Sequence, residues 1–194
     1  LRLPGGGGMK ELSLPASRKD TGWLRAGDLV FLTGEVVTAR DQAHLRLAEL
    51  LRKGKDPPLN LKDGALYHCG PLAKREGREW RILSAGPTTS SRMDSLLPLL
   101  LPWLGVRVVI GKGGVGRETA EVMKEQGCVY LAFPGGCGAL AARAVEEVRG
   151  VYWLELGIPE AMWVLRVRGL GPMVVAIDSR GRNLYEEVRR GMVI

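Results

Sequence analysis

Three short stretches of the sequence combine residue types that could bind an anion. "IGKGGVGRET" places Lys112 in a glycine-rich turn between a run of branched apolar residues and a helical pattern. "TARDQAH" places Arg40 and His44 four residues apart, so on a helix they share a face near its positively polarised N-terminus. "SAGPTTSSRMD" presents Thr88 and three further hydroxyls before Arg92. Because arginine binds carboxylates bidentately, this set suits a small acid with two carboxylates.

The glycine-rich turn also allows a nucleotide-binding interpretation. It resembles the variant phosphate loop "KGGxGK[ST]" of partition-type ATPases, in which a lysine reaches the phosphates and a hydroxyl binds Mg²⁺. Here Arg117 stands in place of the second lysine and Glu118 in place of the hydroxyl. A carboxylate at that position would repel phosphates, so the sequence does not favour ATP binding. A tight turn with a solvated Lys112 is the simpler alternative.

The other two stretches also have simpler explanations. Arg40 and His44 could be a surface arginine and an incidental histidine, and the hydroxyl run could be a helix cap with the remaining hydroxyls solvated. Their places along the chain favour a binding site. The hydroxyl run and the glycine-rich turn each follow directly on a predicted strand, where α/β proteins usually bind ligands.

Strands that alternate with helices would have to position these residues. The sequence predicts a bent strand or strand pair over 28–37 that is broken at Gly34, and then an amphipathic helix over 38–54 that Thr38 caps. The further predicted elements are strands at 64–70 and 79–86 with a charged turn between them, short helical pieces within 87–105, a strand at 106–111, a helix at 116–127, a strand at 128–136, a helix at 137–150, strands at 162–169 and 172–178, and a helix at 184–190. This alternation predicts an α/β fold with a layered sheet.

Composition narrows the class of protein. The 194 residues are 45% hydrophobic, which is enough for one compact domain over residues 9–194. We expect the first eight residues, "LRLPGGGG", to be extraneous or a misplaced start. The net charge of +7 suits an anionic partner, but the basic residues are scattered and only 6% of residues are aromatic, so we expect no nucleic-acid partner. With no long apolar run and three cysteines without metal-ligand spacing, we expect a cytoplasmic protein with no membrane span and no metal site of its own.

Four motifs together resemble a known family. "GEVVTARDQAH", "SAGPTTSSRMD", "GKGGVG" and "AIDSRGRNLYEE" resemble, in order and spacing, the β-subunit of two-subunit class I fumarate hydratases and the similar β-subunit of L(+)-tartrate dehydratase. The resemblance covers residues 27–187. It implies a swivelling β/β/α domain, comparable to the C-terminal domain of single-chain class I fumarases. It also implies a separate α-subunit, in a heterodimer or an α₂β₂ assembly, whose cysteines hold a [4Fe-4S] cluster.

The resemblance further implies roles for individual residues. Arg40, Arg92 and Lys112 would bind the substrate carboxylates, so that the glycine-rich turn holds a carboxylate with Lys112 as its charge. Thr88 and His44 would handle the proton, and the sequence leaves open which of the two transfers it. The expected reaction is the dehydration of (S)-malate to fumarate, with the conversion of L(+)-tartrate to oxaloacetate as the alternative. A non-catalytic anion-binding or regulatory module is the alternative of another class.

Overall fold

The computed structural model describes residues 9–191, so the expected extraneous segment 1–8 lies outside the described residues. Its elements, in chain order, are β1 (Met9–Ser13), α1 (Arg18–Gly22), β2 (Leu29–Thr38), α2 (Asp41–Arg52), β3 (Ala65–Tyr67), β4 (Leu72–Glu76), β5 (Glu79–Ser84), η1 (Ser90–Arg92), α3 (Leu97–Leu104), β6 (Val108–Gly111), α4 (Arg117–Gln126), β7 (Val129–Ala132), α5 (Gly138–Arg143), β8 (Val145–Tyr152), η2 (Leu154–Leu156), β9 (Met162–Ile177) and α6 (Leu184–Arg189).

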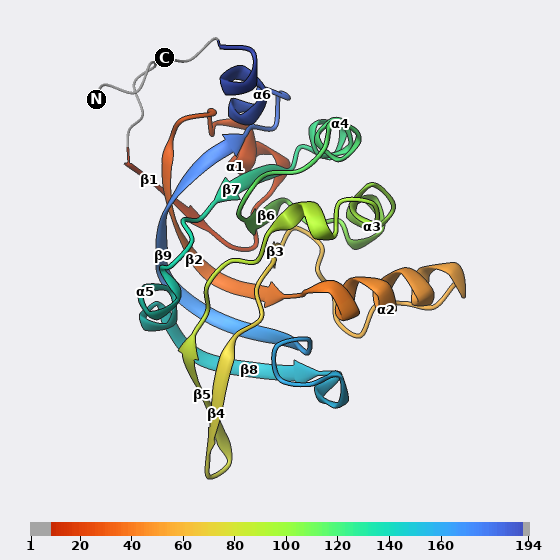
Figure 1. Ribbon diagram of the computed structural model, residues 1–194, viewed down its shortest axis with the longest axis vertical. Coiled ribbons are helices and arrows are strands. Elements are labelled where there is room, and N and C mark those ends of the chain that lie inside the picture. Colours follow the sequence, from red (N-terminus) through yellow and green to blue (C-terminus); the bar gives the residue numbers. More distant parts are fainter. Residues whose placement is uncertain (1–8, 192–194) are drawn as a thin grey trace.

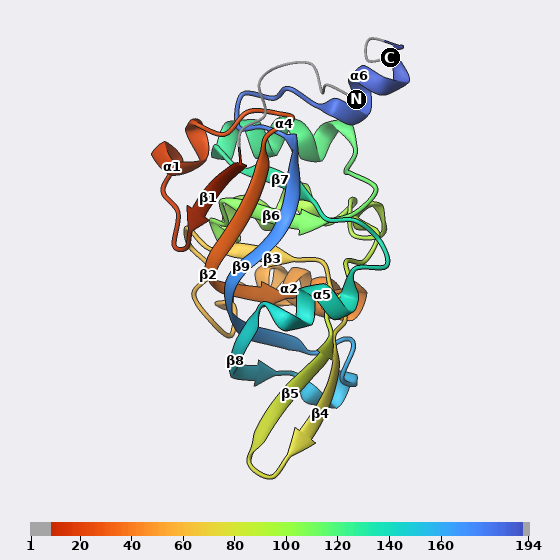
Figure 2. The same ribbon diagram turned by 90° about the vertical axis from the view of Figure 1, so that its left-hand side faces the viewer.

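Most of the strands belong to one sheet that curls into a barrel (Figures 1 and 2). Strands β2, β3, β6 and β7 are parallel neighbours in that order. The long strand β9 pairs antiparallel with β7 and also with β2, which closes the ring. Strands β1 and β8 extend the sheet beyond the ring. The expected α/β class is confirmed, whereas the layered, swivelling arrangement stays a prediction.

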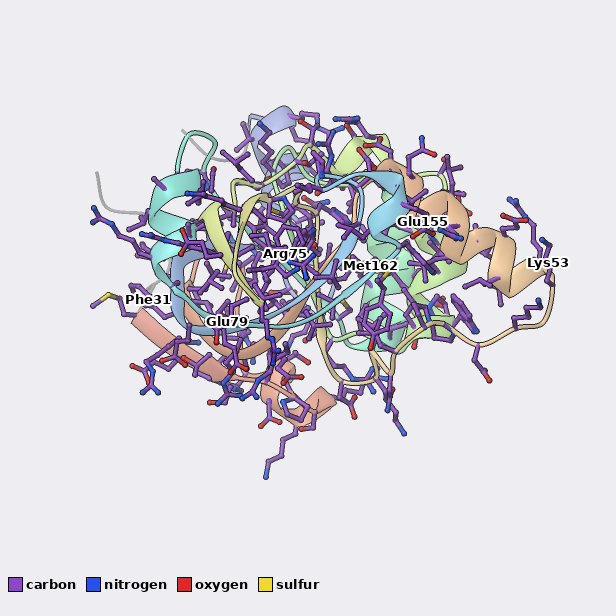
Figure 3. The ribbon with its side chains drawn as sticks, turned by 90° about the horizontal axis from the view of Figure 1, so that it is seen from below. Phe31, Lys53, Arg75, Glu79, Glu155 and Met162 are labelled. Carbon is purple, nitrogen blue, oxygen red and sulfur yellow. The ribbon has the colours of Figure 1, made fainter. Side chains whose placement is uncertain are left out.

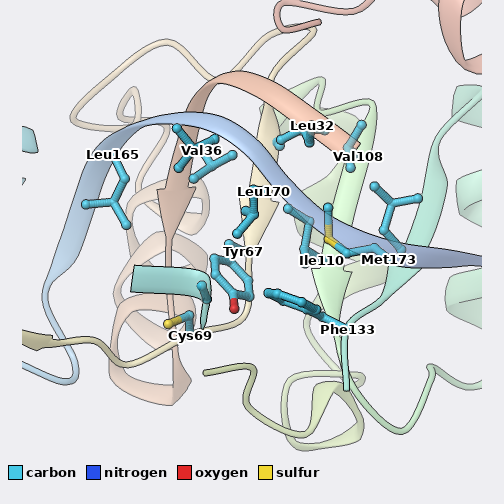
Figure 4. Packing of buried hydrophobic residues seen from close by; sticks show 14 of the residues in the cluster. Leu32, Val36, Tyr67, Cys69, Val108, Ile110, Phe133, Leu165, Leu170 and Met173 are labelled. Atoms are coloured by element: carbon cyan, nitrogen blue, oxygen red, sulfur yellow. The ribbon is translucent and has the colours of Figure 1, made fainter. Parts of the chain in front are cut away.

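The parallel strands are buried on both faces. In β6, Val108 and Ile110 point into the barrel, where they join Tyr67 and Phe133 (Figure 4). The residue between them, Val109, belongs to a second apolar cluster with side chains of α2, α3 and α4. These three helices lie side by side along the outer face of the sheet (Figure 1). A strand with two buried faces reads as an unbroken apolar run, which is why 106–111 is so readily recognised in the sequence.

Two predictions of secondary structure are wrong. The helix expected over 137–150 ends at Arg143, and 145–152 is strand β8, whose valines at 145, 148 and 151 pack on the barrel core. Pairing with β9 outweighs the helix propensity of the two adjacent glutamates. The strands expected at 162–169 and 172–178 are one strand, β9, which passes through Pro172. The pairing of β9 with β2 is irregular at Leu32, and such bulges tolerate proline.

Two smaller differences concern the ends of elements. Thr38 does not cap α2; it ends β2, and its hydroxyl accepts a hydrogen bond from the Trp163 backbone N–H at 3.1 Å. The charged turn expected between the strands at 64–70 and 79–86 is mostly strand β4, which forms a projecting hairpin with β5 (Figures 1 and 2). Figure 3 labels one charged residue of each strand, Arg75 of β4 and Glu79 of β5. Among residues 9–191, no helix is long and apolar enough to cross a membrane.

Candidate functional site

The polar residues singled out in the sequence gather where the parallel strands end. Arg40 follows β2, and Lys112 follows β6; between these two strands, β3 is followed by His68. The segment before η1 crosses this edge. The Thr88 N–H donates to the His68 carbonyl at 2.6 Å, and the Lys112 N–H donates to the Thr88 carbonyl at 3.3 Å. Residues from all three stretches thus lie at one edge of the sheet, as expected for the carboxyl ends of parallel strands.

The two arginines meet around a shared carboxylate. Arg92 donates to Asp41 through two nitrogens, with Nε–Oδ1 at 3.1 Å and Nη2–Oδ2 at 2.7 Å. The Arg40 Nε lies 3.8 Å from the same Asp41 carboxylate and 3.4 Å from Glu160 Oε1. Glu160 also accepts a hydrogen bond from the Gln42 N–H at 2.9 Å, at the start of α2. Asp41 and Glu160 therefore hold both guanidinium groups at the N-terminus of α2.

Lys112 approaches this edge from the other side. Its Nζ lies against the turn that follows β7, 3.8 Å from where a Cβ on Gly135 would be. Burial raises the pKa of the neighbouring Cys137, and the Lys112 charge opposes that rise. Among residues 9–191, no carboxylate lies within ion-pair distance of Lys112, unlike the two arginines. Its charge is therefore available to an anion from outside the chain.

The glycine-rich turn itself holds a carboxylate of the protein. Asp94 Oδ1 accepts hydrogen bonds from the Gly116 N–H at 2.9 Å and from the Thr119 hydroxyl at 2.7 Å. Asp94 thus occupies the N-terminus of α4, the position that a nucleotide phosphate or a substrate carboxylate would need. Within this turn, the Lys112 side chain is therefore the group that we still expect to bind a substrate carboxylate. The same geometry argues against ATP binding.

His44 is completely buried in the first turn of α2. Its Nδ1 lies 2.8 Å from the Arg40 carbonyl oxygen. Because a carbonyl can only accept, Nδ1 carries the proton and Nε2 is left with a lone pair. Burial lowers the pKa of His44 to about 4, against the opposing effects of the Arg40 carbonyl and Asp41. The ring is therefore neutral at pH 7, with the lone pair on its buried Nε2.

The sequence did not single out a second buried histidine at the same edge. His68 Nδ1 lies 2.8 Å from the Ser90 hydroxyl, which lies 2.8 Å from the Tyr130 hydroxyl. The His68 and His44 rings pack edge to face with centroids 5.1 Å apart. One signal could have revealed His68, because it directly follows a buried strand. Glu160 carried no such signal, because it reaches Gln42 from 118 residues away along the chain.

The cysteines do not fit an iron–sulfur cluster, which needs three or four converging thiolates. Cys69 and Cys128 are fully buried, and burial raises the pKa of each to about 12, so both remain thiols. The thiol of Cys137 donates to the Pro134 carbonyl at 2.7 Å at the start of α5, where it packs a turn against the helix. In the described part of the chain, no group of three His, Cys, Asp or Glu side chains is arranged to bind a metal ion.

A cavity of about 560 Å³ lies in another part of the molecule, between β5, α5 and β8. Its lining mixes apolar side chains such as Trp80 and Ile82 with both signs of charge, such as Arg143 and Glu146. None of the polar residues at the strand edge lines it. The chemistry-bearing residues and this cavity are therefore separate features of the chain.

Known proteins share this sequence over almost its whole length. Residues 8–188 match the family model described as Fumarase C-terminus. The L(+)-tartrate dehydratase subunit beta of Escherichia coli is 42% identical over 181 residues, which cover 93% of this chain and 89% of that protein. A Methanocaldococcus jannaschii protein provisionally named L(+)-tartrate dehydratase subunit beta is 43% identical over 175 residues, 90% of each chain.

A longer protein of Geobacillus stearothermophilus, provisionally named fumarate hydratase class I, is 39% identical over 180 residues. The match covers 92% of this chain but 34% of that protein, so this chain corresponds to about a third of it. The resemblance expected from the four motifs is confirmed. The chain belongs to the Fumarase C-terminus family.

Proposed function

We propose that this chain is the β subunit of a hydro-lyase that removes water from a four-carbon 2-hydroxy dicarboxylic acid. The observation that supports this most is that Arg40, Arg92, Lys112 and the neutral His44 lie at the same edge of the sheet. The names of the relatives point the same way, since they describe β subunits of tartrate dehydratase and a fumarate hydratase.

The cations would bind the two carboxylates of the substrate. In this proposal the substrate replaces Asp41 and Glu160 on the guanidinium groups of Arg92 and Arg40, and Lys112 takes the second carboxylate. As the C–H proton leaves, negative charge builds on the carboxylate next to the reacting carbon. Cations that are already fixed in place stabilise that charge more than they stabilise the ground state.

His44 and Thr88 are the two candidates for proton transfer. His44 offers a neutral imidazole with its Nε2 lone pair free. Thr88 has a hydroxyl, a weak base unless a cation or a hydrogen bond activates it, and its backbone pairs with that of Lys112. The tautomer of His44 favours it as the acceptor, and the variants below discriminate between the two.

We assign the Lewis acid to a partner α subunit, because the cysteines of this chain do not fit a [4Fe-4S] cluster. The β subunit would then supply binding and proton transfer, and the partner would supply the cluster that takes the leaving hydroxyl. All three cysteines are free thiols, which suits the reducing cytoplasm. An α₂β₂ assembly is the arrangement that we propose.

For the substrate we propose L(+)-tartrate first and (S)-malate second, which reverses the preference drawn from the sequence. The relatives named as tartrate dehydratase subunits are 42–43% identical and match this chain in length. The relative named as a fumarate hydratase is 39% identical and much longer. The two acids differ by one hydroxyl, which a site distinguishes strongly only when it is built to bond that group.

An anaerobic assay of this chain with its α subunit and reconstituted cluster tests the proposal. We expect turnover of a dicarboxylic acid by the complex, a faster initial rate on L(+)-tartrate than on (S)-malate, and no turnover by the isolated chain. Arg92→Ala should abolish turnover, and Arg168→Ala, an exposed arginine on β9, should not. His44→Gln and Thr88→Val identify the proton-transfer residue by the larger loss of kcat.

A faster rate on (S)-malate would keep the mechanism and return the substrate to the second candidate. An intact complex that is inactive on both acids, but whose isolated β subunit binds either of them, would identify an anion-binding module and overturn the proposal. Turnover by the isolated chain without iron would show that the division of labour between the subunits is wrong.

A further inference from the structure

We propose that Tyr185 of helix α6 is a positioning residue for Lys112, because its ring packs against the glycine-rich turn that carries the lysine and holds that turn in one conformation. The importance of this contact for the reaction rests on the proposed function of Lys112. The contact itself does not depend on that function, and its effect on the turn can be measured in the chain alone.

The turn that follows β6 is held only weakly by its own backbone. Gly113 and Gly114 both have left-handed conformations, with φ of +78° and +75°. In the described part of the chain, no backbone–backbone hydrogen bond involves Gly113, Gly114 or Val115. Because glycine has more conformational freedom to lose than any other residue, this stretch needs contacts from elsewhere to stay in one conformation.

The half-buried ring of Tyr185 supplies such a contact. A Cβ on Gly114 would lie 2.7 Å from Cδ2 and Cε2 of the ring and 3.1 Å from Cγ, so the ring lies directly against the backbone of this glycine. The ring also packs edge to face against Tyr130 of β7, with centroids 6.2 Å apart. Next to it, a Cβ on Gly113 would lie 3.4 Å from the Thr89 methyl group. The turn is thus contacted both by α6 and by the segment before η1.

Tyr185 is itself well fixed at the start of α6, which lies at the same end of the molecule as α4 (Figures 1 and 2). The Asn183 side chain accepts a hydrogen bond from the Tyr185 N–H at 3.0 Å and so caps the helix. Arg182 donates to Glu187 through two nitrogens, at 2.7 and 3.0 Å. Its third nitrogen donates to the Ala26 carbonyl at 3.2 Å, which ties α6 to the barrel.

The turn before α6 is anchored by a buried carboxylate. Asp178 accepts hydrogen bonds from the N–H groups of Ala26 at 3.2 Å, Arg180 at 3.0 Å and Arg182 at 3.1 Å. The motif "AIDSRGRNLYEE" lies outside the strand edge, and none of its residues was assigned a part in the chemistry. Its polar residues instead fix the helix that presents Tyr185 to the glycine-rich turn.

Lys112 depends on this turn because it directly precedes Gly113. Its backbone is bonded to the segment before η1, through the Thr88 carbonyl at 3.3 Å and the Ser90 N–H at 2.9 Å. The Tyr185 contact restrains the residues on its other side. A cation that is fixed in advance stabilises the charge on a reacting carboxylate better than a mobile one, because nothing has to be reorganised during the reaction.

¹⁵N relaxation of the isolated chain tests whether Tyr185 holds the turn. We expect backbone order parameters of ~0.85 at Gly113 and Gly114 in the unmodified chain and below ~0.6 in Tyr185→Ala. Tyr185→Phe keeps the ring and should keep the turn rigid. The matched control is Val188→Ala, which truncates an exposed side chain of the same helix and should change nothing at the turn.

A second variant covers the case in which Tyr185→Ala does not fold. Asn183→Ala removes the cap of α6 and leaves the ring of Tyr185 in the chain, so it should lower the same order parameters by a smaller amount. A turn that is mobile in the unmodified chain would overturn the proposal. So would a turn that stays rigid when Tyr185 or, failing that, Asn183 is replaced by alanine.

The consequence for the reaction is tested in the complex with the α subunit. Tyr185→Ala should raise KM for the dicarboxylic acid by about 10-fold, at the lower end of what the loss of a hydrogen bond to a charged group costs, and should lower kcat by less. Tyr185→Phe should restore the KM of the unmodified complex.

The ratio of the two kinetic effects separates positioning from a loss of folded protein. A merely structural role would reduce the number of active molecules, which lowers kcat and leaves KM unchanged, and that result would overturn the positioning role. If the complex with the unmodified chain were inactive on both acids, the proposed function would fail. The order parameters would then still decide whether Tyr185 holds the glycine-rich turn.

Discussion

Polar side chains are paired differently in two regions: the strand edge, where β2, β3 and β6 end, and the exposed surface of β8 and β9. On the β8–β9 surface, charges are exposed and paired: Arg168 with Glu146, and Arg149 with Glu147 at 3.2 Å. At the strand edge, the Nε2 atoms of His44 and His68 are buried and have no hydrogen-bond partner among residues 9–191, and Arg40 Nε lies within ion-pair distance of Glu160 but lacks hydrogen-bond geometry.

The strand edge is therefore the region that contributes less to the stability of the fold. An exposed ion pair contributes little to stability, whereas each buried unpaired polar group costs roughly 1–3 kcal/mol. Buried unpaired polar groups that gather at one edge of a protein indicate a function there, because they lower its stability. The natural explanation is that those atoms find their partners in a ligand or in a second subunit.

The largest effect should come from filling the space beside Gly111, where the Ser90 hydroxyl meets His68 and Tyr130. Gly111→Ala forces a methyl group into the Ser90 hydroxyl and so combines overpacking with the loss of buried hydrogen bonds, and we expect it to lower the free energy of unfolding by about 4 kcal/mol. Urea denaturation measures this change. Gly22→Ala is the control, because a Cβ there meets nothing within 4 Å, and it should leave stability unchanged or slightly higher.

The second prediction concerns pH. The pKa of His44 is about 4 when folded and near 6.5 when unfolded, so between these values the unfolded chain binds the extra proton. Its stabilising contribution is complete above pH 6.5 and is lost as the pH falls toward 4, by about 3 kcal/mol. Unfolding of the chain and of His44→Gln across this range measures the difference. Equal slopes in both proteins would show that His44 is not buried as a neutral ring.

The third prediction separates the arginines of the two regions. Arg40→Lys removes the planar fork that binds carboxylates, and we expect kcat/KM of the complex to fall about 100-fold, or about 2.7 kcal/mol. Arg168→Lys, on the paired and exposed surface, should leave it unchanged. Equal effects of the two substitutions would remove the functional distinction between the regions.

The smallest effect sharpens the assignment of the glycine-rich turn. Asp94→Ala should destabilise the chain by about 1 kcal/mol, since it removes the carboxylate that caps α4 at the Gly116 N–H. We also expect the empty helix end to bind phosphate or sulfate, which calorimetry would detect in the variant alone. Binding of phosphate or sulfate at the Gly116 N–H of the unmodified chain would show that Asp94 does not occupy the start of α4.

Much of the fold could be predicted because the strands carry their own signal. The buried run at 106–111 and the helix at 116–127 are local patterns, and the structure has both. Strand β8 was mistaken for a helix because its glutamates favour helix, and only its pairing with β9 reveals the strand. The closure of the barrel could not be predicted either, because it depends on β2 and β9, which pair across more than a hundred residues.

The placement of most candidate site residues at one edge of the sheet could be predicted to a similar degree. Lys112 was recognisable because it directly follows the buried run at 108–111, and Arg40, Thr88 and Arg92 because charged and hydroxyl residues cluster in their two motifs. The ion-pair partners of the two arginines could not be recognised in the sequence, because Asp41 meets Arg92 and Glu160 meets Arg40 only after the chain has folded. The neutral state of His44 likewise depends on burial by distant elements rather than on its neighbours in sequence.

The closure of the barrel by β2 and β9 has a consequence for how the protein is made. Leu29 pairs with Val174, so this edge of β2 stays unpaired until residue 174 has left the ribosome. Such long-range pairing makes folding slow, because the entropy of a long loop is lost before the contacts form. During synthesis the nascent chain therefore presents an open sheet edge, and we expect it to need chaperones until β9 has been made.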